Sequence, residues 1–314
     1  MIRVVRVLVS VIVIAGGAWV LRGMRLDQLA ATVRSARWPL VAAAAFANLT
    51  LNTTARAMRW RSFLPPSPRT GRRVSIGAIA VIVLMAQLAN NVLPLRLGEA
   101  LRTLTLHEQQ GHPLRTVIAS QVLEKAVEIT SMSGFAVPAA IFAHRTPRLG
   151  IIAFGIFIAA LTTLFLLTRL ARGPHPSPTR TSPIIRMVRT VQDAARTVDR
   201  PGALWRGLAW SLTSDAIDVC LIGMCCAALG VYVPVPAWCA VLVAVNLATV
   251  IPSTPAQLGM IEAGGLVVLL ELGVPREQAL AATLVYHAVH AVPTSLAGTI
   301  GWAVTALGRR KAAE

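Results

Sequence analysis

Charged residues are scarce in this sequence. Only 14% of its 314 residues are charged, whereas a soluble protein of this size carries about 25%. Hydrophobic residues make up 55% and occur in long blocks, and alternating ten-residue strands are absent. This composition excludes an ordinary soluble domain and predicts an all-α polytopic membrane protein.

Acidic residues and lysine are also rare. The chain has 30 basic and 13 acidic residues, giving a formal net charge of +17. In a soluble protein such basicity favours nucleic-acid binding. Here the arginines lie between apolar blocks, where the positive-inside rule places them. We therefore expect no nucleic-acid partner and expect contact with anionic lipid head groups instead.

The sequence lacks a metal-binding or redox pattern. Its cysteines, Cys220, Cys225, Cys226 and Cys239, lie in or beside apolar segments without a zinc or Cys-x-x-Cys spacing. His107 and His112 resemble a zinc-protease motif, but they are five residues apart, and Gly111 and Pro113 break the helix. We expect neither a cofactor nor a metal.

About six apolar segments are long enough to cross a membrane. The expected spans are residues 7–21, 39–58, 115–143, 149–170, 204–231 and 279–307. A cleaved signal peptide is the alternative for the first, but the arginines and further spans that follow favour a retained helix. Amphipathic patterns predict interfacial helices at 24–37 and 184–198, the latter within a basic cytoplasmic linker at 171–203.

Two further apolar segments, 74–93 and 237–250, run directly into a break. Both breaks contain Pro-x-x-x-Gly followed closely by Glu. Their candidate site residues are Asn91, Pro94, Arg96, Gly98, Glu99 and Arg102 in the first, and Pro252, Pro255, Gly259 and Glu262 in the second. A charge at the bilayer centre costs roughly 2.5–3.5 kcal/mol on insertion scales, so such charges indicate function.

The arginine-rich loops predict where these breaks lie. Loops 56–73 and 169–206 and the tail 309–311 should all be cytoplasmic. Segment 74–108 must then begin and end inside, and segment 237–277 must begin and end outside. The sequence thus predicts opposed re-entrant hairpins in an inverted repeat of 39–143 and 204–307, within a single membrane domain, 1–314. Ordinary full spans are the alternative.

Several predicted spans contain ionisable or amide side chains. Glu124 and Glu128 share a helical face beside Lys125; neutralisation near the membrane surface and a role in substrate or proton handling are equally favoured. Asp215 and Asp218 share a face, and no nearby basic residue in the same span pairs with them.

Other polar groups have weaker patterns. His287 and His290 share a face without a nearby carboxylate in the sequence, which favours packing or gating. Asn246 is the polar residue of the segment before the second break, and Asn48 and Asn52 favour contacts between helices. Asp215, Asp218, Asn246 and His287 form a second tier of candidates.

At these motifs the sequence resembles the flippase-like family named for the transmembrane region of lysylphosphatidylglycerol synthase. The first break matches from Asn91 to Arg102, and Arg59-Trp60 also fits. Glu124-Lys125 and Glu128 resemble an acidic-basic-x-x-acidic pattern, with Lys125 and Glu128 replacing the more usual Arg and Asp. The second break is similar from Pro252 to Glu262, with Ala256 and Gln257 where glycines are common.

The resemblance implies a multi-pass protein of the bacterial inner membrane that translocates lipids between leaflets. Fused relatives carry an aminoacyl-transferase domain after this region; because the chain ends at Glu314, we expect the flippase half and no enzyme activity. Arg96 and Arg102 would hold a lipid phosphate, and Glu99 and Glu262 would orient the arginines or meet a cationic head group.

Three alternatives stand beside this hypothesis. The charges of the first break form salt bridges that only hold the hairpin; the protein is a membrane enzyme that modifies lipid head groups; or it is a non-transporting membrane subunit. Assembly as a homo-oligomer also stays open.

Overall fold

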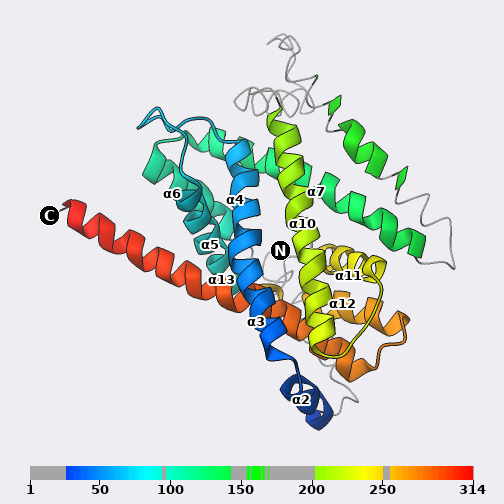
Figure 1. The fold of residues 1–314 in the computed structure, drawn as a ribbon. Helices are drawn as coiled ribbons and strands as arrows, with labels where there is room; N and C mark the ends of the chain where they lie inside the picture. Colours follow the sequence, from blue (N-terminus) through cyan, green and yellow to red (C-terminus); the bar gives the residue numbers. More distant parts are fainter. Residues whose placement is uncertain are drawn as a thin grey trace, which may run out of the picture. The chain divides into compact units, whose positions relative to one another are not determined.

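The computed structural model describes residues 26–93, 97–142, 202–249 and 255–313, with short helical pieces between residues 154 and 169. Every regular element within these ranges is a helix (Figure 1). The all-α fold class is therefore confirmed. The predicted span at 7–21, the interfacial helix at 184–198 and most of the span at 149–170 lie outside the described residues.

The first described helices are α2, Leu26–Arg34, and α3, Trp38–Ala47, which continues through the π-helix η1, Asn48–Asn52, into α4, Thr53–Ser62. After Pro39 in the first turn of α3, this run has no proline or glycine before Pro65. The helix therefore extends past residue 58, the predicted end of the second span. Arg59, which we expected in a cytoplasmic loop, is a buried helical residue instead.

Helices α5, Ile76–Val92, and α6, Gly98–Gln110, form an antiparallel pair. Gly98 lies so close to α5 that a Cβ there would overlap the carbonyl oxygen of Ala86. Further along the pair, Ile79 and Ile82 on α5 and Leu106 on α6 belong to one hydrophobic cluster. The start of α6 thus lies against the later part of α5, and the end of α6 lies near the beginning of α5. The two helices are therefore antiparallel and form a helical hairpin.

Helices α7, Leu114–Phe142, and α10, Ala203–Ala228, are the long helices of the middle of the chain. Their bounds agree closely with the predicted spans at 115–143 and 204–231. Among the described helices, α10 is the one that is both long enough and apolar enough to cross a membrane by itself.

A second helical hairpin follows in α11, Val235–Ala248, and α12, Met260–Glu271, which lie side by side (Figure 1). A Cβ on Gly264 of α12 would lie 2.8 Å from the carbonyl oxygen of Ala244 on α11. Both hairpins thus have a glycine where the backbone of the second helix meets that of the first. The chain ends in α13, Arg276–Ala313, which contains Pro293.

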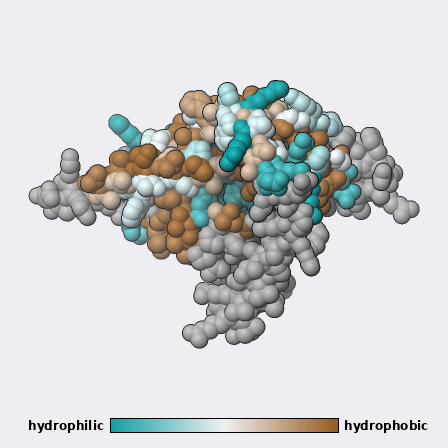
Figure 2. All heavy atoms as spheres, turned by 90° about the horizontal axis from the view of Figure 1, so that it is seen from below, coloured by the Kyte–Doolittle hydropathy of each residue, from teal (hydrophilic) through white to brown (hydrophobic). Residues whose placement is uncertain are grey.

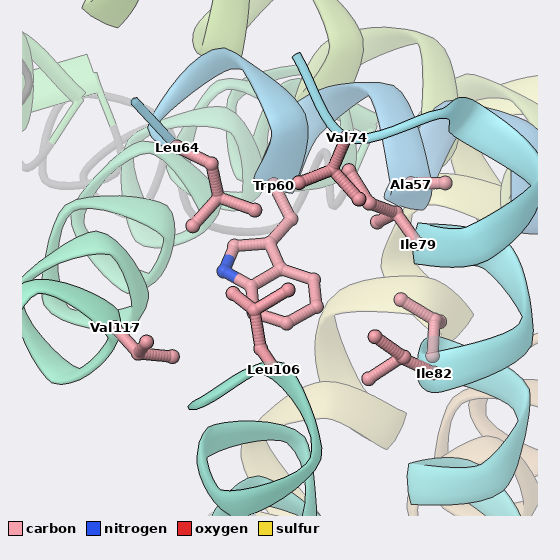
Figure 3. Close-up of a cluster of buried hydrophobic side chains, with 9 residues drawn as sticks. Ala57, Trp60, Leu64, Val74, Ile79, Ile82, Leu106 and Val117 are labelled. Atoms are coloured by element: carbon pink, nitrogen blue, oxygen red, sulfur yellow. The ribbon is translucent and has the colours of Figure 1, made fainter. Parts of the chain in front are cut away.

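The chain divides into two compact units. Unit 1 comprises the described residues of Met1–Asn52, Leu84–Glu99 and Ala216–Glu314, and unit 2 those of Thr53–Val83 and Ala100–Asp215. The core of unit 2 surrounds the indole of Trp60, which is fully buried (Figure 3). The cluster consists of Ala57, Trp60, Leu64, Val74, Ile79, Ile82, Val83, Leu106 and Val117.

Large apolar side chains are also exposed, and they follow the helical period. One stripe along α7 consists of Leu114, Ile118, Val122 and Ile129, and one along α13 consists of Val292, Leu296, Ile300 and Leu307. Figure 2 shows extended hydrophobic patches on the face seen from below. Exposed apolar area of this kind is unfavourable in water and matches contact with lipid tails.

Candidate functional site

The first candidate site is a buried charge cluster in unit 2. Its centre is Glu124 on α7, which bridges two arginines from different helices. Oε1 of Glu124 lies 3.2 Å from Nε of Arg59 on α4, and Oε2 lies 2.6 Å from a terminal nitrogen of Arg102 on α6. All three residues are at most 8% exposed. Buried ions persist only when paired, so the three side chains depend on one another.

Aromatic and hydroxyl groups complete the surroundings of the two arginines. The Arg102 guanidinium lies over the Trp60 ring, 4.0 Å from its centroid, a cation–π arrangement. Trp60 in turn donates its indole N–H to Ser120, at 3.0 Å. Arg59 also donates to the Ser211 hydroxyl, at 3.3 Å. The guanidinium groups are therefore held in fixed orientations.

Two other charges of this cluster, Lys125 and Glu128, lie nearer its edge. Lys125 is 3.0 Å from Glu128, and the Lys125 side chain is 56% exposed. Glu128 also lies 3.6 Å from Arg59, which links the edge to the centre. Asp215 accepts a hydrogen bond from Ser131 at 2.5 Å. Of the predicted residues in unit 2, the structure thus joins Arg102 with Glu124 and Lys125 with Glu128.

The second candidate site lies in unit 1, around Glu262 at the start of α12. Its Oε2 accepts the backbone N–H of Gly259 at 2.7 Å, and its Oε1 lies 2.6 Å from Nδ1 of His287 on α13. Glu262 therefore caps the first turn of its own helix and attaches the second hairpin to α13. Among the described residues its side-chain partner is thus a histidine of α13; whether Glu262 orients Arg96 or meets a cationic head group stays a prediction, because Arg96 lies outside the described residues.

The same unit contains a second carboxylate–histidine pair. Asp218 on α10 lies 2.9 Å from Nε2 of His290 on α13, and its Oδ1 also accepts from Asn52 at 2.6 Å. Asn48 joins Asn52 at 3.1 Å and donates to the carbonyl of Val289 at 3.1 Å. The expectation that the histidines of α13 lack a nearby carboxylate is wrong, because the carboxylates come from other helices.

The first hairpin is attached to α13 as well. Asn91 donates to the Ser295 hydroxyl at 2.9 Å, and Asn90 accepts the backbone N–H of Gly98 at 2.8 Å. Asn90 thus holds the turn between α5 and α6, and Asn91 joins α5 to α13. Glu99 is exposed next to the buried Gly98. Asn246 bonds the carbonyl of Leu242 one turn earlier on its own helix, at 2.9 Å.

The remaining predicted residues are at the breaks. Pro94, Arg96 and Pro252 lie outside the described residues. Pro255 begins the short 3₁₀ helix Pro255–Gln257, and there Ala256 and Gln257 have φ of 54° and 59°. This left-handed region favours glycine, which accounts for the glycines expected at both positions. The turn keeps its shape here at a cost in backbone strain.

Sequence reasoning missed Arg59, Asn52 and His290 as site residues. Each was visible as a polar residue within or beside an apolar segment, but its partner lies at least 65 residues away along the chain. Within the described ranges, the acidic, histidine and cysteine side chains form no group of three that would hold a metal ion.

Comparison with known proteins places the chain in one family. Residues 4–298 match the family described as the lysylphosphatidylglycerol synthase TM region. A search of curated proteins gives no match. The family match spans most of the chain, so the chain belongs to this family and is a membrane protein.

Proposed function

We propose that this member of the lysylphosphatidylglycerol synthase transmembrane-region family translocates a polar, phosphate-bearing lipid between the leaflets of the bacterial inner membrane. The family name points to phospholipids as the substrate class. The observation that carries the proposal is the buried arrangement of Arg59, Glu124 and Arg102 in a protein with an apolar surface. Ionisable side chains inside a membrane protein are costly to bury and commonly mark the path of a polar substrate.

The arginines are suited to a lipid phosphate. A guanidinium bonds a phosphate in the same bidentate way as a carboxylate. The phosphate can therefore replace Glu124, which lies 2.6 Å from Arg102, as the partner of this arginine. The displaced Glu124 keeps Arg59, at 3.2 Å, as its second partner. In this exchange Arg102 passes from Glu124 to the phosphate while Glu124 stays paired with Arg59. The head group can therefore move without leaving any of these ions unpaired.

The two hairpins support a re-entrant architecture in an inverted repeat. Helices α5 and α11 have 17 and 14 residues, lengths of about 25 and 21 Å at 1.5 Å per residue. Both are shorter than a hydrocarbon core of about 30 Å. Each belongs to a pair with a close glycine contact, Gly98 in the first and Gly264 in the second.

Contacts at the open end of the first hairpin also support it. Arg61, in the last turn of α4, donates to the carbonyl of Val74 at 2.9 Å, and Ser67, in the basic loop that follows α4, donates to the carbonyl of Gln110 at 3.0 Å. The residue before the hairpin and the last residue of α6 thus contact one basic segment. Because its two ends lie together, the hairpin returns in this proposal to the membrane face from which it entered. The helices that flank it cross the membrane, so the proposed protein is multi-pass.

A transport assay tests the proposal. The full chain, reconstituted in liposomes with fluorescent phospholipids, is expected to accelerate movement between leaflets. Arg102→Lys keeps the charge and loses the bidentate fork, and we expect about a tenfold lower rate. Arg115→Lys, at an exposed position on α7, is the matched control and should transport like the wild type. Transport by Arg102→Lys at the wild-type rate would contradict the site.

A further inference from the structure

Helix α13 contains a proline, Pro293, near the middle of its length. Because proline has no backbone N–H, the carbonyl of Val289, four residues earlier, lacks its usual donor within the helix. Asn48, at the start of the π-helix η1, donates its side-chain amide to this carbonyl at 3.1 Å. A side chain from another helix of unit 1 thus supplies the hydrogen bond that the proline removes.

The surroundings of Asn48 fix the orientation of its amide. Its Oδ1 accepts a hydrogen bond from Asn52 at 3.1 Å, so its Nδ2 is the atom that faces α13. Asn48 and Val289 are both buried, and a buried carbonyl without a donor is unfavourable. Helix α13 contacts both α3 and η1, which it crosses at this place (Figure 1). The contact with Asn48 therefore compensates for Pro293.

The residue after the proline adds a second irregularity to the same turn. Thr294 is buried, and its hydroxyl donates to the carbonyl of His290 at 2.5 Å, one turn earlier in α13. Hydrogen bonds of this kind often bend helices, and proline is a common cause of sharp kinks. The turn from Val289 to Thr294 therefore resists bending less than a regular helical turn does.

The part of α13 before the proline is attached to the second hairpin. His287 lies 2.6 Å from Glu262 on α12. A Cβ on Gly265 of α12 would overlap the side chain of Thr283 on α13, so the two helices are in close contact there as well. A movement of the second hairpin must therefore carry this part of α13 with it.

The part of α13 after the proline is attached to the first hairpin. Asn91, near the end of α5, donates to the Ser295 hydroxyl at 2.9 Å and lies 3.4 Å from the carbonyl of Ala291. A Cβ on Gly298 would lie 2.5 Å from the carbonyl oxygen of Leu84 on α5. This portion of α5 belongs to unit 1, as α13 does. The proline thus lies between the main attachments of the two hairpins.

We propose that the turn of α13 at Pro293 is a joint that couples the two hairpins, and that Asn48 holds this joint by satisfying the carbonyl that the proline leaves without a donor. Bending at the joint changes the angle between the two parts of α13. A movement of the second hairpin is thereby passed to the end of α5. The joint follows from contacts within unit 1, whereas its role in transport rests on the proposed lipid translocation.

A double-mutant cycle tests the link between Asn48 and Pro293. Asn48→Ala leaves the Val289 carbonyl without a donor, and we expect the unfolding temperature of the full chain in detergent to fall by about 4 °C. Pro293→Ala restores the backbone N–H, so Asn48→Ala should lower the unfolding temperature by at most half as much in that background. Equal effects of Asn48→Ala in both backgrounds would overturn the role of Asn48.

Thr50→Ala is the matched control for this cycle. Thr50 lies in the same π-helix and donates to the carbonyl of Phe46 in the preceding turn, at 2.7 Å. Its substitution should therefore change the unfolding temperature equally with and without Pro293→Ala.

The joint itself is tested by the distance between the two ends of α13. In a full chain without its native cysteines, spin labels at Glu277→Cys and Ala306→Cys are measured by double electron–electron resonance in lipid nanodiscs. A straight helix would separate the two Cα atoms by about 43 Å at 1.5 Å per residue. We expect shorter and more broadly distributed distances with Pro293, and a narrow distribution near the straight-helix value in Pro293→Ala.

Thr299→Ala is the control for the distance measurement. It removes a hydroxyl bond to the carbonyl of Ser295 on α13 but leaves the proline in place, so the distribution should stay as it is with Pro293. An unchanged distribution in Pro293→Ala would overturn the joint.

Transport rates connect the joint to the proposed function. Pro293→Ala leaves the arginine cluster of unit 2 unaltered, so the half-saturating lipid concentration should stay the same while the maximal rate falls about tenfold. A wild-type maximal rate in Pro293→Ala would refute the coupling. Absence of any lipid transport by the wild type would refute the proposed function and the coupling with it, while the unfolding temperatures and the distances would still decide the joint.

Discussion

The guanidinium of Arg102 lies 2.6 Å from the carboxylate of Glu124, although the two residues belong to different helices and both are buried. This pair connects the motif at the first break to the acidic motif of α7. Because Glu124 also contacts Arg59 at 3.2 Å, one carboxylate determines the orientation of both guanidinium groups.

Glu124→Gln should strongly destabilise unit 2. The change leaves two buried arginines without their shared carboxylate, and breaking a buried ion pair in this way costs about 3–5 kcal/mol. Lys125→Gln is the control, since that side chain is 56% exposed and surface pairs contribute at most about 1 kcal/mol. Thermal unfolding in detergent measures both. Equal effects of the two substitutions would show that the cluster does not stabilise the fold.

Gly98→Ala should open the first hairpin. The added Cβ would overlap the carbonyl oxygen of Ala86 and the side chain of Asn90, and such overpacking costs about 1–3 kcal/mol. Gly77→Ala in the same hairpin meets nothing within 4 Å, so it should be neutral or slightly stabilising. Unfolding temperatures and transport rates compare the two variants. A neutral Gly98→Ala would rule out the close contact between α5 and α6.

Cysteine labelling should reveal the opposed hairpins. In a chain without its native cysteines, Ser75→Cys and Glu108→Cys, at the two ends of the first hairpin, should react with a membrane-impermeant maleimide from one side. Tyr232→Cys and Glu271→Cys, at the ends of the second, should react from the other side. All four positions are exposed. Labelling of Ser75→Cys and Glu108→Cys from opposite sides would indicate a full span instead.

His112 should make the fold sensitive to acid. It lies between α6 and α7, its ring is fully buried, and burial lowers its pKa below the ordinary 6.5. The unfolded chain therefore binds more protons as the pH falls through 6.5, so stability from this group is present above that pH and is lost below it. We expect a lower unfolding temperature at pH 5 than at pH 7.5.

His112→Leu tests this assignment, because leucine is apolar and does not titrate. The variant should show a smaller difference between the two pH values than the wild type. Arg115→Lys, at an exposed position on α7, should behave like the wild type. An unchanged pH dependence in His112→Leu would assign the effect to another group.

The bounds of the helices were predictable to within a few residues where the length of an apolar segment and the helix-breaking residues at its ends define them. Helices α7 and α10 agree with their expected spans, and α5 ends at Val92, one residue before the predicted end of its apolar segment, 74–93. The helix from α3 to α4 runs past its predicted end, residue 58, because arginines are good helix formers and neither proline nor glycine occurs between Pro39, in its first turn, and Pro65. Basic residues alone do not end a helix.

The sequence by itself determined the helical fold, the family and the places where apolar segments break, because these depend on composition, periodicity and local backbone chemistry. Only the tertiary structure decided the partners: Glu124 with Arg59 and Arg102, and Glu262 with His287. A helical period states which side chains share a face, but not which helix that face meets. That choice depends on how segments far apart in the chain pack together. The partner of each buried charge therefore follows from the tertiary structure and not from the sequence pattern.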